Sequence, residues 1–561
     1  GFAGSPRAAL PPCPARQAAP ALTALAFALA IALPAYAQDA AGDQEGAGDL
    51  DTIQVLGSRA KNRTAAETAA PVDIIRTEQL ERTGARELGQ LLQMLEPSFN
   101  FSRTTISDGT DIIRPATLRA LGPDQVLVLV NGKRRHQQAL VNVQQTIARG
   151  SAGTDINAIP VTAIERIEVL RDGAAAQYGS DAIAGVINIV LKKQTEETQL
   201  FFEAGETAEG DGQVLHGGLN HGFALGDDGY LNLSVEYRDR EETNRAGPDS
   251  LRVSPARVTQ RIGDADSTDA YVWLNGAIGA GNGELYWFGG LSRREGDSSG
   301  FYRSAGDGRT VPALYPNGFL PNIITTVEDG SLAVGYRSSF NDTWDWDLSV
   351  NHGRSRFGFH ERNSVNVSWW YEPINPADPA SPLYLSSPTS ADTGTLEFEQ
   401  TTLNFDVRGS VDIGSDEPLN LAFGTEYRRE NFSIEAGDPV SYTYGRTNNP
   451  AIQIFNQNGG FAAPGIQGFP GFSPNEEVDD GRHSYALYAD AEARFGGKFL
   501  VGGAVRFEDY SDFGNTTTGK LSLRYDFTDT FALRGTISTG FRAPGVQQLF
   551  YSQRSTNIDP T

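Results

Sequence analysis

The sequence contains a single cysteine among 561 residues, and this residue, Cys13, lies near the first residue of the chain. It precedes an apolar segment that we expect to be cleaved off, so the mature chain is predicted to have neither a disulfide nor a thiol nucleophile. We also expect no zinc-protease motif of the H-E-x-x-H type and no nucleophile-elbow serine of the G-x-S-x-G type. The sequence therefore does not predict an enzyme.

Positive charge and histidine are scarce as well. The chain has 46 Lys and Arg against 70 Asp and Glu, a net charge of −24. Such a chain is repelled by phosphate backbones, so no nucleic-acid partner is expected. The histidines show no H-x-x-x-H spacing or similar cluster, and neither a metal site nor a cofactor is predicted. They are His136, His216, His221, His352, His360 and His483.

A glycine-dotted stretch, ERIEVLRDGAAAQYGSDAIAGVINIV at 165–190, could be mistaken for a phosphate-binding loop. A dinucleotide site needs G-x-G-x-x-G at the start of a crossover helix. Gly173, Gly179 and Gly185 are instead spaced six apart, and the second apolar run follows at once. We therefore interpret these glycines as tight turns and close backbone contacts in a small sheet.

The only long apolar run, ALTALAFALAIALP, follows Arg7 and Arg16 and is closed by Ala35-Tyr36-Ala37. Its length of about fourteen residues falls short of the roughly twenty that a spanning helix needs. The pattern predicts a secretory signal peptide over 1–37, cleaved before Gln38, with a membrane anchor as the alternative.

Residues 38–70 are polar, acidic and small, which predicts a disordered periplasmic tether. It carries one short β-prone run, which consists of Asp51, Thr52, Ile53, Gln54 and Val55. Such a run can pair with the sheet edge of a partner protein, because main-chain hydrogen bonds supply the affinity. It could equally be the first strand of the following domain.

Residues 71–193 have the pattern of a compact α/β domain. PVDIIR predicts a strand, Thr77 is expected to cap a helix, and four leucines recur at helical spacing in the next segment. DQVLVLVNGKRR predicts a buried strand that enters an Asn131-Gly132 hairpin turn. VTAIERIEVLRDG predicts a short helix and a further strand. The four leucines are Leu88, Leu91, Leu92 and Leu95.

From residue 194 onward, polar and apolar residues alternate over long stretches. In GYLNLSVEYRDRE one face would carry Leu231, Leu233, Val235 and Tyr237, and the other face Asn232, Ser234, Glu236 and Arg238. TWDWDLSVNHG and LRYDFTDTFALRG repeat the pattern. Strands of about ten residues or more are long enough to cross a bilayer at a tilt.

Connection lengths also alternate along this part of the chain. Tight turns are expected at 226–229, 280–283, 341–343 and 528–530, and long polar loops at roughly 242–268, 296–329, 355–394 and 433–481. Short turns at one end and long loops at the other are typical of an outer-membrane barrel. We therefore predict a transmembrane barrel over 194–561, with a secreted β-protein as the alternative.

Three motifs give the chain a family resemblance: LRALGPDQVLVLVNGKRR, IERIEVLRDGAAAQYGSDAIAGVINIVLKK and GFRAPGVQQLF. With them the chain resembles the TonB-dependent outer-membrane receptors. The resemblance implies an α/β plug domain, 71–193, inside a large antiparallel barrel of about twenty-two strands. About thirteen strands are recognisable after Gln194, and no apolar closing strand precedes Thr561, so we expect the chain to be C-terminally incomplete.

The resemblance also implies a function. DTIQV at 51–55 is similar to the family's TonB box, which a TonB-type periplasmic energy-coupling protein binds. The expected location is the outer membrane of a Gram-negative bacterium, where the barrel contacts lipid and a scarce nutrient is imported. A passive gated porin is the alternative. The few residues between Gln38 and Asp51 leave no room for a signalling domain, so no transcriptional role is expected.

The ligand is less strongly indicated. A ferric siderophore is the leading expectation and an oligosaccharide the second, while haem is disfavoured because no histidine follows the FRAP box at 541–544. The aromatic residues Trp369, Trp370 and Tyr371 could stack on a ligand, although membrane-interface or loop packing is favoured. By position in the family, four plug residues are expected to face the ligand. They are Asp124, Gln125, Gln137 and Gln138.

Overall fold

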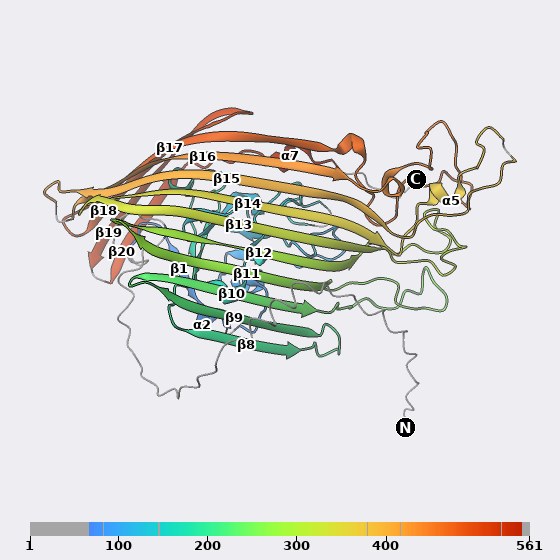
Figure 1. Ribbon diagram of the computed structural model, residues 1–561, viewed down its shortest axis with the longest axis horizontal. Helices are drawn as coiled ribbons and strands as arrows, with labels where there is room; N and C mark the ends of the chain where they lie inside the picture. The colour runs from blue at the N-terminus through green and yellow to red at the C-terminus, as the bar shows by residue number, and fades with distance from the viewer. Residues whose placement is uncertain are drawn as a thin grey trace, which may run out of the picture. The chain divides into compact units, whose positions relative to one another are not determined.

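The computed structural model describes residue 56 and residues 67–552, apart from 82, 144–145, 379, 416 and 529. The expected signal peptide (1–37) and the DTIQV run (51–55) lie outside the described residues, as does most of the expected tether. Plug and barrel belong to one compact unit, Asp49–Thr561. In Figure 1 the plug elements, coloured blue to cyan, lie behind the long green-to-orange strands of the second sheet.

The plug is built on a five-stranded sheet in the order β1-β6-β7-β4-β5. The strands β4 and β7 are parallel neighbours and are buried along their whole length, as their mainly apolar sequences predict. The other pairings are antiparallel. The strand bounds are β1 (Val72–Arg76), β6 (Ile164–Leu170), β7 (Gly185–Leu191), β4 (Val126–Val130) and β5 (Lys133–Arg134).

The hairpin between β4 and β5 confirms the turn predicted from sequence. Asn131 and Gly132 both have positive φ, 47° and 80°. A two-residue turn of this type needs positive φ at both positions, and Asn-Gly is the pair that tolerates it best. The Asn131 side chain fixes the turn further, because its Oδ1 accepts from the amide of Leu191 at 2.9 Å.

Short helices surround the plug sheet. The helix α3 buries Leu88, Leu91 and Leu92 as its spacing predicted, and these side chains belong to the same core as the β4 and β7 valines and isoleucines. The helical elements are α2 (Thr77–Glu81), α3 (Leu88–Leu95), η1 (Pro123–Gln125), η2 (Ile156–Ala158), η3 (Val161–Ala163) and α4 (Ala175–Tyr178). A small separate ladder pairs β2 (Phe99–Phe101) with β3 (Ala116–Leu118).

Thr77 does not act as the expected cap. It is the first residue of α2, and its Oγ1 lies 2.8 Å from the carbonyl oxygen of Ile164 and 2.7 Å from that of Glu165. The hydroxyl therefore ties α2 to the start of β6. A helix cap would have its hydroxyl accept from a nearby backbone amide of the helix. Here the hydroxyl donates to carbonyl groups that are distant in sequence instead.

The second sheet contains thirteen antiparallel strands in chain order, with β8 and β20 at its two edges, which confirms the number expected from sequence. Each strand pairs with the next along the chain. The bounds are β8 (Thr198–Gly205), β9 (Val214–Leu225), β10 (Gly229–Arg240), β11 (Asp266–Ala280), β12 (Gly283–Ser299), β13 (Asn322–Asn341), β14 (Trp344–Arg362), β15 (Ala391–Val411), β16 (Leu419–Ala436), β17 (Val478–Phe495), β18 (Phe499–Tyr510), β19 (Gly514–Thr528) and β20 (Phe531–Ser538).

Burial in this sheet is the reverse of that in a water-soluble protein. On β10 the polar residues Asn232, Ser234, Glu236 and Arg238 are buried, whereas Tyr237 is 42% exposed. Leu200, Phe202 and Leu291 on other strands are between 69% and 78% exposed. Apolar residues facing outward and polar residues facing inward are what a bilayer outside and a filled lumen inside require.

Most connections follow the predicted alternation, although 511–513, between β18 and β19, is a short connection at the long-loop end. One end of the sheet has short connections, and the other end carries the long loops 241–265, 300–321, 363–390 and 437–477, which include α5 (Val367–Tyr371), α6 (Pro439–Tyr442) and η4 (Pro474–Glu476). The loops expected at 296–329 and 355–394 are shorter than predicted, because β12, β13 and β14 continue as paired strands beyond the length needed to span a bilayer. No helix in the described part of the chain is long and apolar enough to cross a membrane.

The plug touches the barrel closely enough to require glycine on a barrel strand. A Cβ built on Gly353 of β14 would overlap the ring of His136 in the plug. That ring is 3% exposed, and its Nε2 lies 2.9 Å from Asp329 Oδ2 on β13. A Cβ built on Gly358, five residues further along β14, would have no atom nearer than 3.8 Å.

We therefore predict that Gly353→Ala loosens the plug. The added methyl group overpacks the contact with His136 and should cost about 1–3 kcal/mol of plug stability. Pulse proteolysis of the membrane-embedded protein in urea measures this loss. Gly358→Ala is the matched control and should unfold at the wild-type urea concentration; equal loss in both variants would contradict the contact.

Candidate functional site: the contacts between plug and barrel

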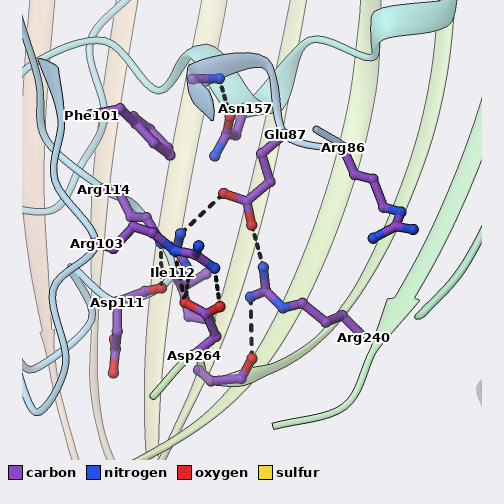
Figure 2. A network of polar contacts seen from close by, with 12 residues as sticks. Arg86, Glu87, Phe101, Arg103, Asp111, Ile112, Arg114, Asn157, Arg240 and Asp264 are labelled. Atoms are coloured by element: carbon purple, nitrogen blue, oxygen red, sulfur yellow. Dashed lines mark hydrogen bonds and ion pairs between the residues drawn. The ribbon is translucent and has the colours of Figure 1, made fainter. Parts of the chain in front are cut away.

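A largely buried network of charges joins the start of the plug helix α3 to the barrel (Figure 2). Glu87, the residue before α3, faces the guanidinium of Arg114 at 3.3 Å and also pairs with Arg240 at the end of β10. Arg114 reaches across to Asp264, next to β11, at 3.0 Å, and Arg103 pairs with the same carboxylate. We call these five residues the Glu87 network.

Electrostatics holds the Glu87 network in its charged form. Glu87 and Arg114 are both 5% exposed. Burial by itself raises the pKa of Glu87, but the guanidinium groups of Arg114, Arg240 and Arg238 outweigh it, so this pKa lies well below its usual range. The carboxylate therefore stays ionised, and removal of one partner would leave uncompensated buried charge.

A second contact is centred on Asp181, in the glycine-dotted stretch between β6 and β7. Its carboxylate accepts from Arg134 of β5 at 2.8 Å and from Arg542 at 3.0 Å. Arg542 follows β20 and also pairs with Asp124 of the plug at 3.0 Å. We call Asp124, Arg134, Asp181 and Arg542 the Asp181 cluster. In this cluster the guanidinium of Arg542, from the barrel domain, binds two plug loops.

The sequence NGKRRH supplies a third set of contacts. Lys133 pairs with Asp347 of β14 at 2.7 Å and with Asp406 of β15 at 3.3 Å. Arg135 and His136, two and three residues later, both reach Asp329 of β13. Lys133 and Arg135 thus pair with three neighbouring barrel strands, β13, β14 and β15.

The structure brings three of the four predicted ligand-facing residues, Asp124, Gln137 and the backbone of Gln138, against one barrel segment, 541–550, which contains α7 (Val546–Phe550). Asp124 pairs with Arg542, and Gln137 Oε1 accepts from Gln547 Nε2 at 3.3 Å. Gln125, in η1, is half-buried. The GFRAPGVQQLF motif is therefore a contact of the plug.

Gln138 does not face outward. It is 2% exposed, and its side-chain amide donates to the carbonyl oxygen of Leu140 at 2.8 Å and to Asn142 Oδ1 at 3.0 Å. Its own carbonyl oxygen accepts from Gln547 at 3.0 Å. Internal hydrogen bonds thus occupy the side-chain amide of Gln138, and its expected contact with a ligand stays a prediction.

The aromatic residues of the long loops pack on one another. Trp369 Nε1 donates to Thr443 Oγ1 at 2.7 Å, and the guanidinium of Arg446 lies 4.7 Å from the Trp369 ring and 4.2 Å from that of Tyr384. Trp370 and Tyr371 are half-buried against an apolar cluster of three loops. Loop packing, the favoured interpretation from sequence, accounts for these residues.

Leu56, the residue that follows the DTIQV run, is 5% exposed and packs into a small apolar cluster of the plug. The cluster includes Leu127 and Leu129 of β4 and Val186 of β7. Among the described residues, Leu56 thus contacts the central strands of the plug sheet.

Two catalytic expectations can be compared with the structure. The G-x-S-x-G spacing does occur, at 296–300, but Ser298 lies in strand β12 and its Oγ donates to the carbonyl oxygen of Ile323. A nucleophile elbow needs a sharp turn between a strand and a helix, so this serine does not form one. Among the described residues, no group of three His, Cys, Asp or Glu is arranged to hold a metal ion.

Sequence reasoning missed most charged residues of the interface, although a signal was present. Glu426, Arg428 and Glu430 alternate along β16, and all three are buried. In a strand, residues two apart share a face, so a run of alternating charges opposite apolar residues marks a polar lumen. Such runs indicate a charged plug surface but do not identify its residues.

Comparison with known proteins agrees with this architecture. The family model "TonB-dependent Receptor Plug Domain" matches residues 64–186, and "TonB dependent receptor-like, beta-barrel" matches 281–561. The ferric enterobactin receptor of Pseudomonas aeruginosa is 24% identical over 94% of this chain and 66% of its own length. The vitamin B12 transporter BtuB of Vibrio cholerae is 33% identical over 96% of this chain and 70% of its own length.

Solved structures show the same fold. The siderophore receptor PirA from Acinetobacter baumannii has a TM-score of 0.58 at 21% identity, covering 84% of this chain and 61% of that one. The unliganded ferric citrate transporter FecA has a TM-score of 0.57 at 14% identity, covering 86% and 64%. The protein belongs to the TonB-dependent receptor family, whose matched members are receptors and transporters by name. The chain spans less than two thirds of the length of the first of these relatives and of the solved structures.

The Glu87 network predicts a pH-dependent stability. Glu87→Gln should destabilise the plug by about 3–5 kcal/mol at pH 7, because it leaves two buried guanidinium groups short of a counter-charge. The pKa of Glu87 is depressed in the folded state, so its stabilisation is present above its ordinary value of 4.5 and is lost as pH falls below it. Pulse proteolysis in urea should show a smaller stability difference between wild type and Glu87→Gln at pH 3 than at pH 7.

The exposed acid Glu78 of α2 provides the control for this measurement. Glu78→Gln should leave plug stability unchanged at both pH values. If wild type were more stable than Glu87→Gln by the same amount at both pH values, the result would contradict a charged Glu87.

The Asp181 cluster makes a separate prediction. Arg542→Gln should lower the free energy needed to open the two plug loops by about 2–5 kcal/mol, because it removes the cation shared by Asp124 and Asp181. Protease should then cleave these loops more readily. Arg542→Lys should restore only part of the loss, because one ammonium cannot span two carboxylates as a guanidinium does. Arg293→Gln, which breaks exposed ion pairs within the barrel alone, is the control. Plug cleavage equal in Arg542→Gln and Arg293→Gln would refute the role of this segment.

Proposed function

We propose that this protein is an outer-membrane receptor of a Gram-negative bacterium that imports a scarce nutrient, a ferric siderophore, with energy delivered by a TonB-type periplasmic protein. The observation that carries the proposal is the plug itself. It is bound to the inward face of the barrel by the Glu87 network, the Asp181 cluster and the Lys133–His136 contacts. A solute can pass only if some of these contacts are released, and each release costs energy.

The DTIQV run is the proposed point of energy input. Asp51 to Val55 would pair with the sheet edge of the periplasmic partner, where main-chain hydrogen bonds give affinity. Leu56 supports this role, because it packs against β4 and β7 in the plug core. A pull on the tether would therefore act first on the two central strands, which precede and follow the loops of the Asp181 cluster.

Similarity to relatives supports a ferric siderophore as ligand. The ferric enterobactin receptor matches 94% of the chain, and several of the similar solved structures are siderophore receptors. At the plug, Asp124, Gln125 and Gln137 remain the proposed ligand-facing residues, since each keeps some exposed surface. Gln138 would act through the backbone, by holding Gln547 in place.

A corrinoid such as vitamin B12 is the second candidate, because the vitamin B12 transporter of Vibrio cholerae is 33% identical over nearly the whole chain. The oligosaccharide alternative has less support, since Trp369, Trp370 and Tyr371 are engaged in loop packing. Haem has less support as well. Arg542 of the FRAP box pairs with two plug carboxylates, which gives this segment a structural role.

Uptake by whole cells tests the proposal. Cells that carry the receptor should bind iron-55 ferric enterobactin and accumulate it, whereas cells that lack the TonB-type partner should bind it without accumulation. Ile53→Pro, which removes a strand amide from the box, should reproduce the partner deletion. Ala65→Pro, elsewhere in the tether, is the control and should accumulate normally.

The same assay separates the candidate ligands. Accumulation of cobalt-57 cyanocobalamin in place of the iron complex would move the assignment to a corrinoid. Passage of either solute at equal rates with and without the partner would contradict energised import and indicate a passive porin.

A further inference from the structure

The inward face of the barrel changes character at the end that carries the long loops. On β10 this face is polar, but here the inward side chains of β14, β15 and β16 include aromatic rings that are at most 2% exposed. Apolar groups that face a lumen need a cover that keeps water away. Part of that cover is the loop segment 465–472, which we call the strap. The wall residues are Phe357, Phe359, Phe398 and Phe432, and they share one core with Phe469 and Phe472 of the strap and with Ile112 and Ile113 of the plug.

Specific contacts hold the strap against this wall. The amide of Gln467 donates to Ser364 Oγ at 2.8 Å, and the serine hydroxyl donates back to the Gln467 carbonyl oxygen. The ring of Phe469 stacks on that of Phe359, with centroids 4.2 Å apart and planes 12° from parallel. Gln467 and Phe469 are both 0% exposed. The strap is therefore packed into the mouth of the barrel, although it belongs to the long loop 437–477.

One carboxyl group lies directly beneath the strap. Glu361, the residue before last of β14, is 0% exposed, and its Oε1 accepts from the amide of Phe469 at 3.0 Å. Its Oε2 is buried and has no hydrogen-bond partner among the described residues. Gly468 has a φ of 120°, and a Cβ built there would overlap this oxygen. A buried oxygen without a partner is far less costly in a neutral carboxyl than in a carboxylate.

The surroundings of Glu361 favour the neutral form. β14 needs about ten of its residues to cross a bilayer, so Glu361 lies beyond the membrane. Burial raises the pKa of Glu361 well above its ordinary value of 4.5, and the nearby carboxylates of Asp108 in the plug and Asp297 in β12 raise it further. The amide of Phe469 and the guanidinium of Arg303, in the loop 300–321, oppose this rise. Burial also lowers the pKa of Arg303, to about 10.

We propose that Glu361 is a proton-dependent anchor of the strap. While the carboxyl carries its proton, the strap stays packed on the aromatic wall and on the plug residues Ile112 and Ile113. When the proton is lost to the solvent, the carboxylate needs water, and the strap leaves the wall to admit it. The inference goes beyond the proposed import function and does not depend on it, because it concerns how one long loop is held.

The direction of the pH dependence follows from the raised pKa of Glu361. The packed strap binds the proton more tightly than the open strap, in which the carboxyl regains its ordinary value of 4.5. The stabilisation of the packed strap is therefore complete below pH 4.5 and is lost as pH rises toward the raised value. Within this window each pH unit should increase the open population about tenfold.

Hydrogen–deuterium exchange of the purified receptor in lipid nanodiscs tests the anchor, because it measures local opening. The exchange of residues 465–472 is followed at pH 5.5, 7.0 and 8.5, with labelling times scaled to the intrinsic rate. In wild type the protection of these amides should fall about tenfold or more between pH 5.5 and 8.5. Glu361→Gln keeps the acceptor oxygen for Phe469 without a charge, so its protection should be equal at the two pH values.

Two further variants separate the anchor from simple packing. Glu295→Gln, which changes an exposed acid of β12, should keep the wild-type pH dependence. Phe469→Ala removes the ring that stacks on Phe359, so it should lower protection at every pH and leave the pH dependence in place. Wild-type protection that does not change with pH, or a pH dependence that persists in Glu361→Gln, would overturn the proposal. A failure of cells to accumulate ferric enterobactin would refute the import function and leave this result unaffected.

Discussion

The polar inward face of the barrel is the constraint on which the rest of the structure depends. A bilayer outside requires apolar residues on the outer face, and strand geometry then directs every second side chain inward. Charged residues on that inner face can be buried only if a partner neutralises them. Some of these charges pair within the barrel, as Arg238 does with Asp269. Others pair with the plug, in the Glu87 network, the Asp181 cluster and the Lys133–His136 contacts.

The plug is held by apolar packing as well as by charge. Its strands β4 and β7 share one apolar core with barrel residues such as Trp273 and Phe288, and ion pairs and hydrogen bonds add further contacts with the barrel. Buried ion pairs are directional and contribute little net stability compared with an apolar interface of equal area, yet they fix one position strongly. Displacement of the plug would exchange these contacts for water within the lumen.

Local sequence pattern was sufficient for most of the fold. The alternation in β10 and β14, the Asn131-Gly132 turn and the leucine spacing of α3 all depend on neighbours within a few residues, and each predicted element formed. The ends of β12 to β14 were misjudged, because strand pairing continues where composition already resembles a loop. Thr77 was misjudged because its hydroxyl meets carbonyl groups of residues that follow it by more than eighty positions.

The candidate site could be predicted only in part, for the same physical reason. Asp124 pairs with Arg542 across 418 positions of sequence, and no local rule connects them. The sequence suggested Asp124 and Gln137 as ligand-facing residues by position alone. It did not indicate that the Gln138 amide would form internal hydrogen bonds with Leu140 and Asn142. Charge alternation in β16 indicates a polar lumen, but the partner of each charge depends on the three-dimensional docking of the plug.

Hydrogen–deuterium exchange of the receptor in outer membranes, with and without a soluble domain of the proposed periplasmic partner under load, tests the central claim most directly. A plug held by buried charges should show slow exchange for the amides of β4 and β7 at rest, and exchange there should rise when the tether is pulled while the barrel strands stay protected. Rapid exchange in the plug sheet at rest, with the barrel protected, would contradict the claim that ion pairs anchor the plug.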